Sequence, residues 1–142
     1  MLDYHARPNQ FIIEIPGSEC VVHIICVHLG LFERERQNQL AVLAKRIKSH
    51  IPEDEPLIIA GDFNDWRSRA ERHLHEDLGV KEAYKTTRGA HARTFPAWFP
   101  VLSMDRIYYR GIEVNDCHRL HGQPWSRLSD HTPLLAEFSI HV

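Results

Sequence analysis

The sequence predicts an α/β fold, because short apolar runs that suit buried strands alternate with one long helical pattern. Residues 57–60 are apolar at every position, which indicates a strand covered on both faces. Between residues 33 and 50, Leu40, Leu43 and Ile47 recur at spacings of three and four, as on the buried side of a helix. No repeat or linker divides the 142 residues, so we expect a single domain over residues 1–142.

Shorter patterns predict the other elements. In chain order, they are strands at residues 10–15 and 20–27 joined as a hairpin, a short helix opened by a capping box at 68–71 and closed by Gly79, and strands at 105–109 and 133–140. Arg36 lies on the apolar stripe of the long helix. Its side chain either reaches water along its alkyl stem or is buried as a structural group beside Gln39.

The charge balance argues against a broad nucleic-acid interface. The formal net charge is −2 and the pI is near 6.6, whereas binding along a phosphate backbone usually needs a basic face. No stretch approaches the roughly 20 apolar residues of a membrane span, and the amino terminus lacks the form of a signal peptide. We therefore expect a cytoplasmic protein with no membrane span.

The cysteines do not predict a disulfide or zinc framework. The three cysteines lack a paired spacing, so we expect them to be reduced and partly buried. Cys20, His23, Cys26 and His28 fall close together, but strand alternation turns His23 away from Cys26 and His28. His23 is therefore interpreted as structural, while His28 ends its strand, where active-site residues of open sheets collect.

One polar element follows the buried strand at residues 57–60. Gly61 permits a sharp turn, and in an extended segment Asp62 and Asn64 would face one site while Phe63 enters the core. The alternative is that Asp62 and Asn64 only form a turn, since both residue types are common there.

A second polar element, Ser129-Asp130-His131, precedes the strand at residues 133–140. Asp105 opens the strand at 105–109. A carboxylate that accepts a ring N–H of a histidine fixes its tautomer and stabilises its charged form, so Asp105 is our candidate for orienting His131.

Together these segments resemble the endonuclease/exonuclease/phosphatase superfamily, which has the deoxyribonuclease I-like fold. The motifs occur in the family's order: Val27-His28-Leu29-Gly30-Leu31, Arg36 with Gln39, Gly61-Asp62-Phe63-Asn64, Asp105-Arg106-Ile107 and Ser129-Asp130-His131-Thr132-Pro133. The resemblance covers residues 10–140 but only the carboxyl-terminal half of a family domain. It implies half of a four-layer α/β/β/α sandwich, with a mixed, mainly antiparallel sheet and helices on one face.

The resemblance also implies roles for individual residues. Asp62 would orient the attacking water, Asn64 would hold the phosphate or water, and His28 would act near the phosphate as an acid or donor. Asp105 would pair with His131, which would contact the scissile phosphate. The metal would be Mg²⁺ or Mn²⁺, because carboxylate, amide and imidazole groups suit such ions. Its predicted ligands are Asp130, Asp62, Asn64 and His131.

One departure from the family concerns the metal. Family members carry an Asn and a metal-binding Glu in their amino-terminal half, and neither motif is found in this sequence. We therefore expect a divalent-metal-dependent phosphoesterase, of phosphodiesters or phosphomonoesters, with a half-supplied metal site. The alternative is a truncated, non-catalytic remnant that binds a phosphate or a protein. A serine hydrolase using Ser129 and His131 is disfavoured, because no Gly-x-Ser-x-Gly elbow is present.

The expected partners follow from this interpretation. The substrate would be a phosphate ester, such as a nucleic acid, a phospholipid headgroup or a small phosphate ester. An apolar face at residues 57–60 would lack its cover, which predicts a homodimer or a complementing amino-terminal half. Ahead of Asp105, Trp98 and Phe99 either select the substrate or plug the core under a loop, and Trp125 shares this ambiguity.

Overall fold

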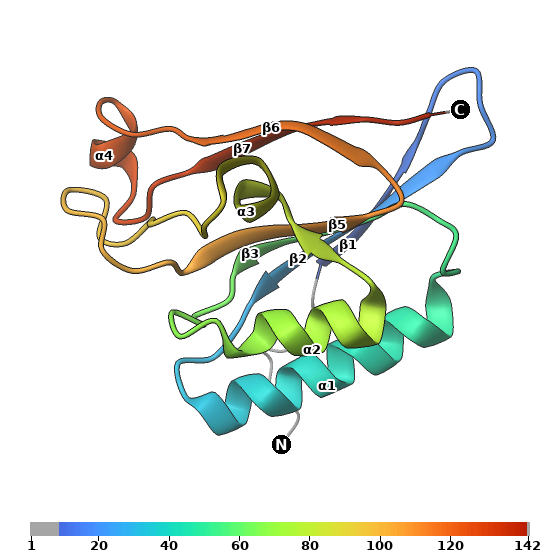
Figure 1. The fold of residues 1–142 in the computed structure, drawn as a ribbon, viewed down its shortest axis with the longest axis horizontal. Coiled ribbons are helices and arrows are strands. Elements are labelled where there is room, and N and C mark those ends of the chain that lie inside the picture. The colour runs from blue at the N-terminus through green and yellow to red at the C-terminus, as the bar shows by residue number, and fades with distance from the viewer. Residues whose placement is uncertain (1–8, 142) are drawn as a thin grey trace.

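The computed structural model describes residues 9–141, which form two β-sheets and four helices (Figure 1). The five-stranded sheet has the order β1-β2-β3-β5-β4, and the second sheet pairs β6 with β7. The strands are β1 (Asn9–Glu14), β2 (Val21–His28), β3 (Leu57–Asp62), β4 (Lys81–Glu82), β5 (Asp105–Arg110), β6 (Glu113–Arg119) and β7 (Leu134–Ser139). The helices are α1 (Glu33–His50), α2 (Arg69–Leu78), α3 (Ala83–Arg88) and α4 (Trp125–Leu128).

The larger sheet is mixed and mainly antiparallel, as predicted. Only β2 and β3 run parallel, while β1 pairs with β2, and β5 with β3 and β4, in antiparallel fashion. The register sets His28 beside Asp62, and Asp62 beside Asp105. Because paired residues project from the same side of a sheet, this register alone aligns three polar side chains across neighbouring strands.

Helices α1 and α2 cover one side of the larger sheet (Figure 1). The predicted stripe of α1, with Leu40, Leu43 and Ile47, is buried in one cluster with Leu57 and Ile59 of β3. The apolar period of α1 therefore places the helix on the sheet, and the sheet in turn fixes the strand ends. No helix in residues 9–141 combines the length and apolar character that crossing a membrane requires.

The opposite side of β3 and β5 is not bare, which corrects the expected uncovered face at residues 57–60. Helix α3 and the β6–β7 sheet pack there, and Tyr109 meets Phe138 with ring centroids 5.4 Å apart. Leu57 and Ile59 are fully buried, and Ile58 packs against this second cluster. The exposed apolar strand is instead β1, at the sheet edge, where Phe11, Ile12 and Ile13 face solvent.

Strand β2 alternates as the sequence predicted. His23 is buried and lies 2.5 Å from Glu55, while Cys26 and His28 face the other side. Cys26 is exposed, so the expectation that every cysteine is partly buried was wrong for this residue. Burial raises the pKa of the Cys117 thiol to about 11, which suits a packed rather than a reactive side chain.

The start of α2 differs from the predicted capping box. Ser68 adopts a left-handed conformation and caps nothing. Asp65 takes its place, since its carboxylate accepts the N–H groups of Arg69 at 2.9 Å and Ala70 at 2.8 Å. Gly79 ends the helix in the left-handed conformation, as predicted.

Candidate active site

A row of polar side chains crosses the ends of three adjacent strands. His28 ends β2, Asp62 ends β3 and Asp105 begins β5. The Nε2 of His28 lies 3.7 Å from Oδ2 of Asp62, and its side chain is 78% exposed at the mouth. Gly61 permits the close pairing of β2 and β3, because it has φ +143° and a Cβ there would overlap the carbonyl oxygen of Val27.

His131 completes the row from the segment before β7. Its Nδ1 lies 2.6 Å from Oδ2 of Asp105, and its Nε2 lies 3.8 Å from Oδ2 of Asp62. The ring also packs against Phe95, with centroids 5.0 Å apart. One ligand atom each from Asp62, Asp105 and His131 fall within 4.8 Å of one another, so these three groups can act on one ion or one phosphate.

Asp105 is held by a residue that the sequence analysis missed. Thr94 is fully buried and its hydroxyl donates to Oδ2 of Asp105 at 2.6 Å. The backbone carbonyl of Thr94 accepts the N–H of Thr132 at 2.7 Å, next to His131. Thr94 therefore ties together both members of the Asp105–His131 pair. A buried hydroxyl needs such a partner, but the sequence does not reveal which one.

Asn64 reaches the site through a different backbone path from the one expected. β3 ends at Asp62, and Asn64 has φ +46°, so the segment is a turn rather than an extension of the strand. The Asn64 N–H donates to Oδ1 of Asp62 at 2.9 Å, and its Nδ2 donates to the carbonyl of Leu29 at 2.6 Å. Phe63 enters the core, as predicted.

The turn after His28 is anchored by the first turns of α1. Arg36 is buried and donates to the carbonyls of Gly30, at 3.3 Å, and Leu31. Gln39 accepts the N–H of Gly30 at 2.8 Å. The buried structural reading of Arg36 is therefore confirmed, and the snorkelling alternative is excluded.

A second buried pair, Asp65 with Arg106, was not foreseen. The Arg106 side chain is completely buried, and its Nη1 lies 3.0 Å from Oδ2 of Asp65. Arg106 also donates to the hydroxyl of Ser68 and to the carbonyl of Ser103. This pair joins the loop after Asp62 to the strand that begins at Asp105, so it fixes the spacing between the two carboxylates.

The electrostatics of the row favour a proton-accepting Asp62 and a charged His131. Burial raises the pKa of Asp62 above its ordinary value, the Asn64 N–H offsets part of this, and the negative charge of Asp105 adds to the rise. Burial of His131 works against its charged form, but the hydrogen bond and charge of Asp105, with Asp62 and Asp130, outweigh it and raise its pKa.

We expect Asp105→Asn to lower the pKa of His131, because the substitution removes the neighbouring charge that raises it. Titration of the histidine ring by NMR in metal-free protein measures this directly. The folded-state pKa of His131 exceeds its unfolded value of 6.5, so the pair stabilises the fold below that pH, and the contribution is lost as the pH rises through the folded pKa. An unchanged titration in Asp105→Asn would contradict the assignment.

Asp130 stands apart from this row. It is exposed, and its backbone carbonyl accepts the N–H of Ala97 at 2.7 Å. Within residues 9–141, the three-residue group of carboxylate and imidazole side chains that could hold an ion does not include Asp130. Asn64 carries an amide and is held by its hydrogen bonds to Asp62 and to the Leu29 carbonyl. Their part in metal binding stays a prediction.

The row opens into a pocket of about 570 Å³. Its polar lining includes His28, Asp62, Asn64 and His131, and its apolar lining includes Leu31, Phe32, Phe95 and Met104.

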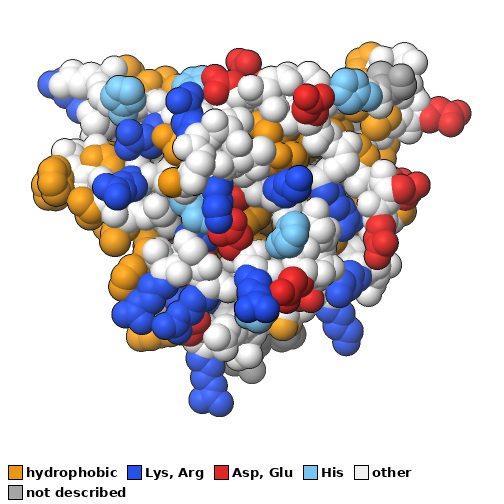
Figure 2. All heavy atoms as spheres, viewed as in Figure 1, with side chains coloured by type: hydrophobic (Ala, Val, Ile, Leu, Met, Phe, Trp, Pro, Cys, Tyr) orange, Lys and Arg blue, Asp and Glu red, His pale blue; other side chains and the backbone are white. Residues whose placement is uncertain are grey.

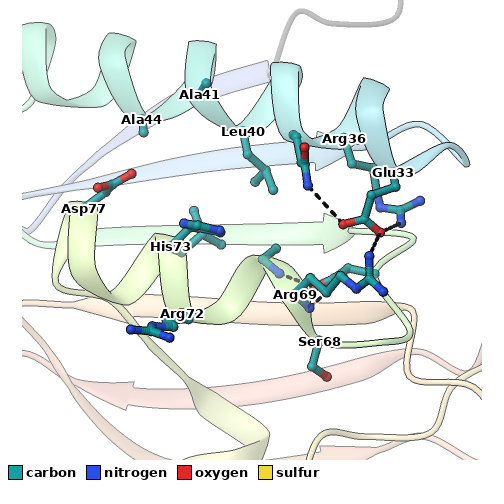
Figure 3. A pocket seen from close by; sticks show the side chains of 14 residues that line it. Glu33, Arg36, Leu40, Ala41, Ala44, Ser68, Arg69, Arg72, His73 and Asp77 are labelled. Atoms are coloured by element: carbon teal, nitrogen blue, oxygen red, sulfur yellow. Dashed lines mark hydrogen bonds and ion pairs between the residues drawn. The ribbon is translucent and has the colours of Figure 1, made fainter.

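A separate groove of about 750 Å³ lies between α1 and α2 (Figure 3). There Glu33 pairs with Arg36 at 3.2 Å and with Arg69 at 3.3 Å. The two hollows share no lining residue.

Comparison with known sequences shows the family of this chain. Residues 2–131 match the sequence model of the Endonuclease/Exonuclease/phosphatase family. The chain belongs to this family. The Escherichia coli K12 protein YbhP, described as uncharacterized, is 44% identical over 127 residues, which cover 89% of this chain and 49% of YbhP. The chain therefore spans about half the length of this endonuclease/exonuclease/phosphatase-family relative.

Solved structures of similar fold show the same coverage. A conserved protein of unknown function from Enterococcus faecalis V583 superposes with a TM-score of 0.77 at 19% identity, over 92% of this chain and 54% of its own. The catalytic domain of human Nocturnin with bound sulfate superposes with a TM-score of 0.69 at 21% identity, over 92% and 51%. The fold is thus that of the endonuclease/exonuclease/phosphatase family.

Proposed function

We propose that this chain is the carboxyl-terminal portion of a divalent-metal-dependent phosphoesterase, and that it carries the water-orienting and phosphate-contacting groups of the site. The observation that supports this most is the convergence of Asp62, Asp105 and His131, with the Asp105–His131 contact at 2.6 Å. These groups lie far apart in sequence and meet only at the strand ends. Family membership supports the same reaction class.

Three side chains of the site have different roles in this proposal. Asp62 aligns a water or accepts a proton from it. The raised pKa of its carboxyl makes it a better proton acceptor. His131, charged and held by Asp105, donates from Nε2 to the phosphate, where negative charge develops during reaction. His28 stands exposed at the mouth and provides a further donor.

The donor set fits a hard or borderline divalent ion. Oδ2 of Asp62 accepts no hydrogen bond within residues 9–141, so its lone pairs are free, whereas Oδ2 of Asp105 already accepts from Thr94 and lies 2.6 Å from His131. Asp62, Asn64 and Asp130 are the proposed ligands of Mg²⁺ or Mn²⁺, because a charged His131 that donates from Nε2 has no lone pair there for an ion. When bound, such an ion would neutralise the phosphate and acidify a water.

Hydrolysis of a soluble phosphodiester tests this function. We expect turnover of bis(p-nitrophenyl) phosphate with Mn²⁺ or Mg²⁺, and its loss on adding a chelator. Because few carboxylates of this chain face the ion, the rate should rise when an amino-terminal half with the family's Asn and Glu is supplied. Binding of phosphate without any metal-dependent turnover, even with that half present, would favour the non-catalytic remnant.

We also propose that the chain, purified alone, forms a homodimer through β1. This edge strand exposes Phe11, Ile12 and Ile13, and unpaired edges with apolar side chains favour pairing with another chain. Sedimentation at micromolar concentration should give about twice 16.6 kDa. A stable monomer would overturn the dimer. The cytoplasmic location and the type of phosphate ester stay predictions as well.

A further inference from the structure

Exposed large apolar side chains gather on the side of the molecule where the site lies. Within residues 9–141, most of the exposed large hydrophobic residues fall in four segments at this end, and the others lie on β1, α1 and β7. We call the group on this side the apolar rim. It consists of Leu31, Phe32, Trp66, Trp98, Phe99, Val101, Trp125 and Leu128. Trp98 is 80% and Phe32 76% exposed, so Trp98 does not plug the core.

The rim segments are tied to the site and to each other. Leu31 and Phe32 line the pocket together with Phe95 and His131. The Ala97 N–H donates to the carbonyl of Asp130, which joins the Trp98 loop to the segment that follows α4. Figure 1 shows the loops that carry these residues on one side of the molecule, at the left, where the strands of the site end. The rim segments therefore lie on the side of the molecule that carries the pocket, rather than being scattered over the whole surface.

The loop that carries Trp98 and Phe99 projects from the surface. Phe95 and Leu102 form a backbone bridge at its base, and the two tip rings stack on each other with centroids 6.4 Å apart. Since Trp98 and Phe99 pack mainly on one another, they contribute little to the core. Exposed apolar groups of this kind commonly mark a protein or membrane contact.

Unpaired arginines accompany the apolar side chains. Arg34, Arg67 and Arg127 are exposed in or beside the rim segments, and no carboxylate in the described part of the chain pairs with them. The Arg67 guanidinium lies over the Trp66 ring, 4.5 Å from its centroid. Figure 2 shows Lys or Arg side chains next to hydrophobic ones along this left edge. Cations among interfacial aromatics complement a surface that is both anionic and apolar.

We infer that the apolar rim docks on an anionic lipid surface, so that the pocket meets phosphate esters carried by that surface. This inference rests on the proposed function and narrows its substrate class. Trp and Phe favour the headgroup boundary, and arginines add attraction to anionic lipids. Single-stranded nucleic acid fits less well, because Leu31, Val101 and Leu128 have no ring on which a base can stack, and the net charge is −2.

Intrinsic fluorescence reports on this surface alone, because all three tryptophans of the chain belong to the rim. We expect a blue shift on adding vesicles of phosphatidylglycerol in phosphatidylcholine, together with co-sedimentation that weakens as salt is raised. Vesicles of pure phosphatidylcholine should bind more weakly. The double variant Trp98→Ser/Phe99→Ser should lose about tenfold or more in partitioning to anionic vesicles.

Val42→Ser provides the matched control, because Val42 is 64% exposed on α1, away from the rim. It should partition as the unmodified chain does, and circular dichroism should show all variants folded. No binding to anionic vesicles, equal loss in Val42→Ser, or a fluorescence response to an oligonucleotide but not to vesicles would overturn the inference. Turnover of bis(p-nitrophenyl) phosphate without vesicle binding refutes the docking alone. Vesicle binding without turnover, even with the amino-terminal half present, refutes the proposed function alone.

Discussion

Asp62→Asn is expected to lower metal-dependent phosphodiester hydrolysis by about a hundredfold or more, the usual scale for an acid–base or charge-stabilising group. The amide keeps the size of the carboxyl and can still accept the Asn64 N–H. In the unmodified chain this N–H donates to Oδ1 of Asp62 at 2.9 Å. The turn should therefore survive while the proton-accepting oxygen that faces His28 and His131 is lost. Steady-state kinetics with Mn²⁺ measures the loss.

His131→Ala should cost a similar factor, because it removes the group that Asp105 and Phe95 hold toward the site. Both variants need an active reference, so they are assayed with the amino-terminal half present if the chain alone is too slow. His73→Ala and His118→Ala serve as controls and should be nearly silent, since neither residue lines the pocket of the row. Full turnover by both Asp62→Asn and His131→Ala would show that the site is elsewhere.

Local patterns in the sequence predict the strand ends at which Asp62 and Asp105 lie, and the family resemblance predicts that they share one site with His131. An apolar run identifies β3, and the polar residues directly after it must lie at the sheet edge. Asp105 begins an antiparallel neighbour, so it reaches the same edge. Periodicity also predicts α1, because Leu40, Leu43 and Ile47 recur at helical spacing and Arg36 continues the same side into the first turns.

Features that depend on contacts distant in sequence were not predictable in this way. Thr94 and Arg106 look like ordinary loop and strand residues until the fold places Asp105 and Asp65 beside them. Ser68 stands at a position typical of a helix cap. The N–H groups at the start of α2 bond instead to the carboxylate of Asp65, which Arg106 holds in place. The cover over Ile58 comes from β6 and β7, which pair across a long connection that no local pattern reveals.

Arg106→Met should lower the free energy of unfolding by about 3–5 kcal/mol, the usual cost of removing one partner of a buried ion pair. Met retains much of the packing volume, but the Asp65 carboxylate, whose side chain is 3% exposed, would remain buried without its cation. Asp65 still accepts the Arg69 and Ala70 N–H groups, which limits the loss. Urea unfolding followed by fluorescence measures the change.

The double variant Asp65→Asn/Arg106→Met distinguishes a broken ion pair from a general packing defect. If an isolated buried charge causes the loss, the double variant should be less destabilised than the sum of the two single variants. Arg72→Met is the matched control, because Arg72 pairs with Glu76 on the exposed face of α2 and its removal should leave stability unchanged. An Arg106→Met protein as stable as the unmodified chain would show that the Asp65–Arg106 pair does not hold the two carboxylate-bearing segments together. In that case the spacing of Asp62 and Asp105 would depend on the β3–β5 register alone.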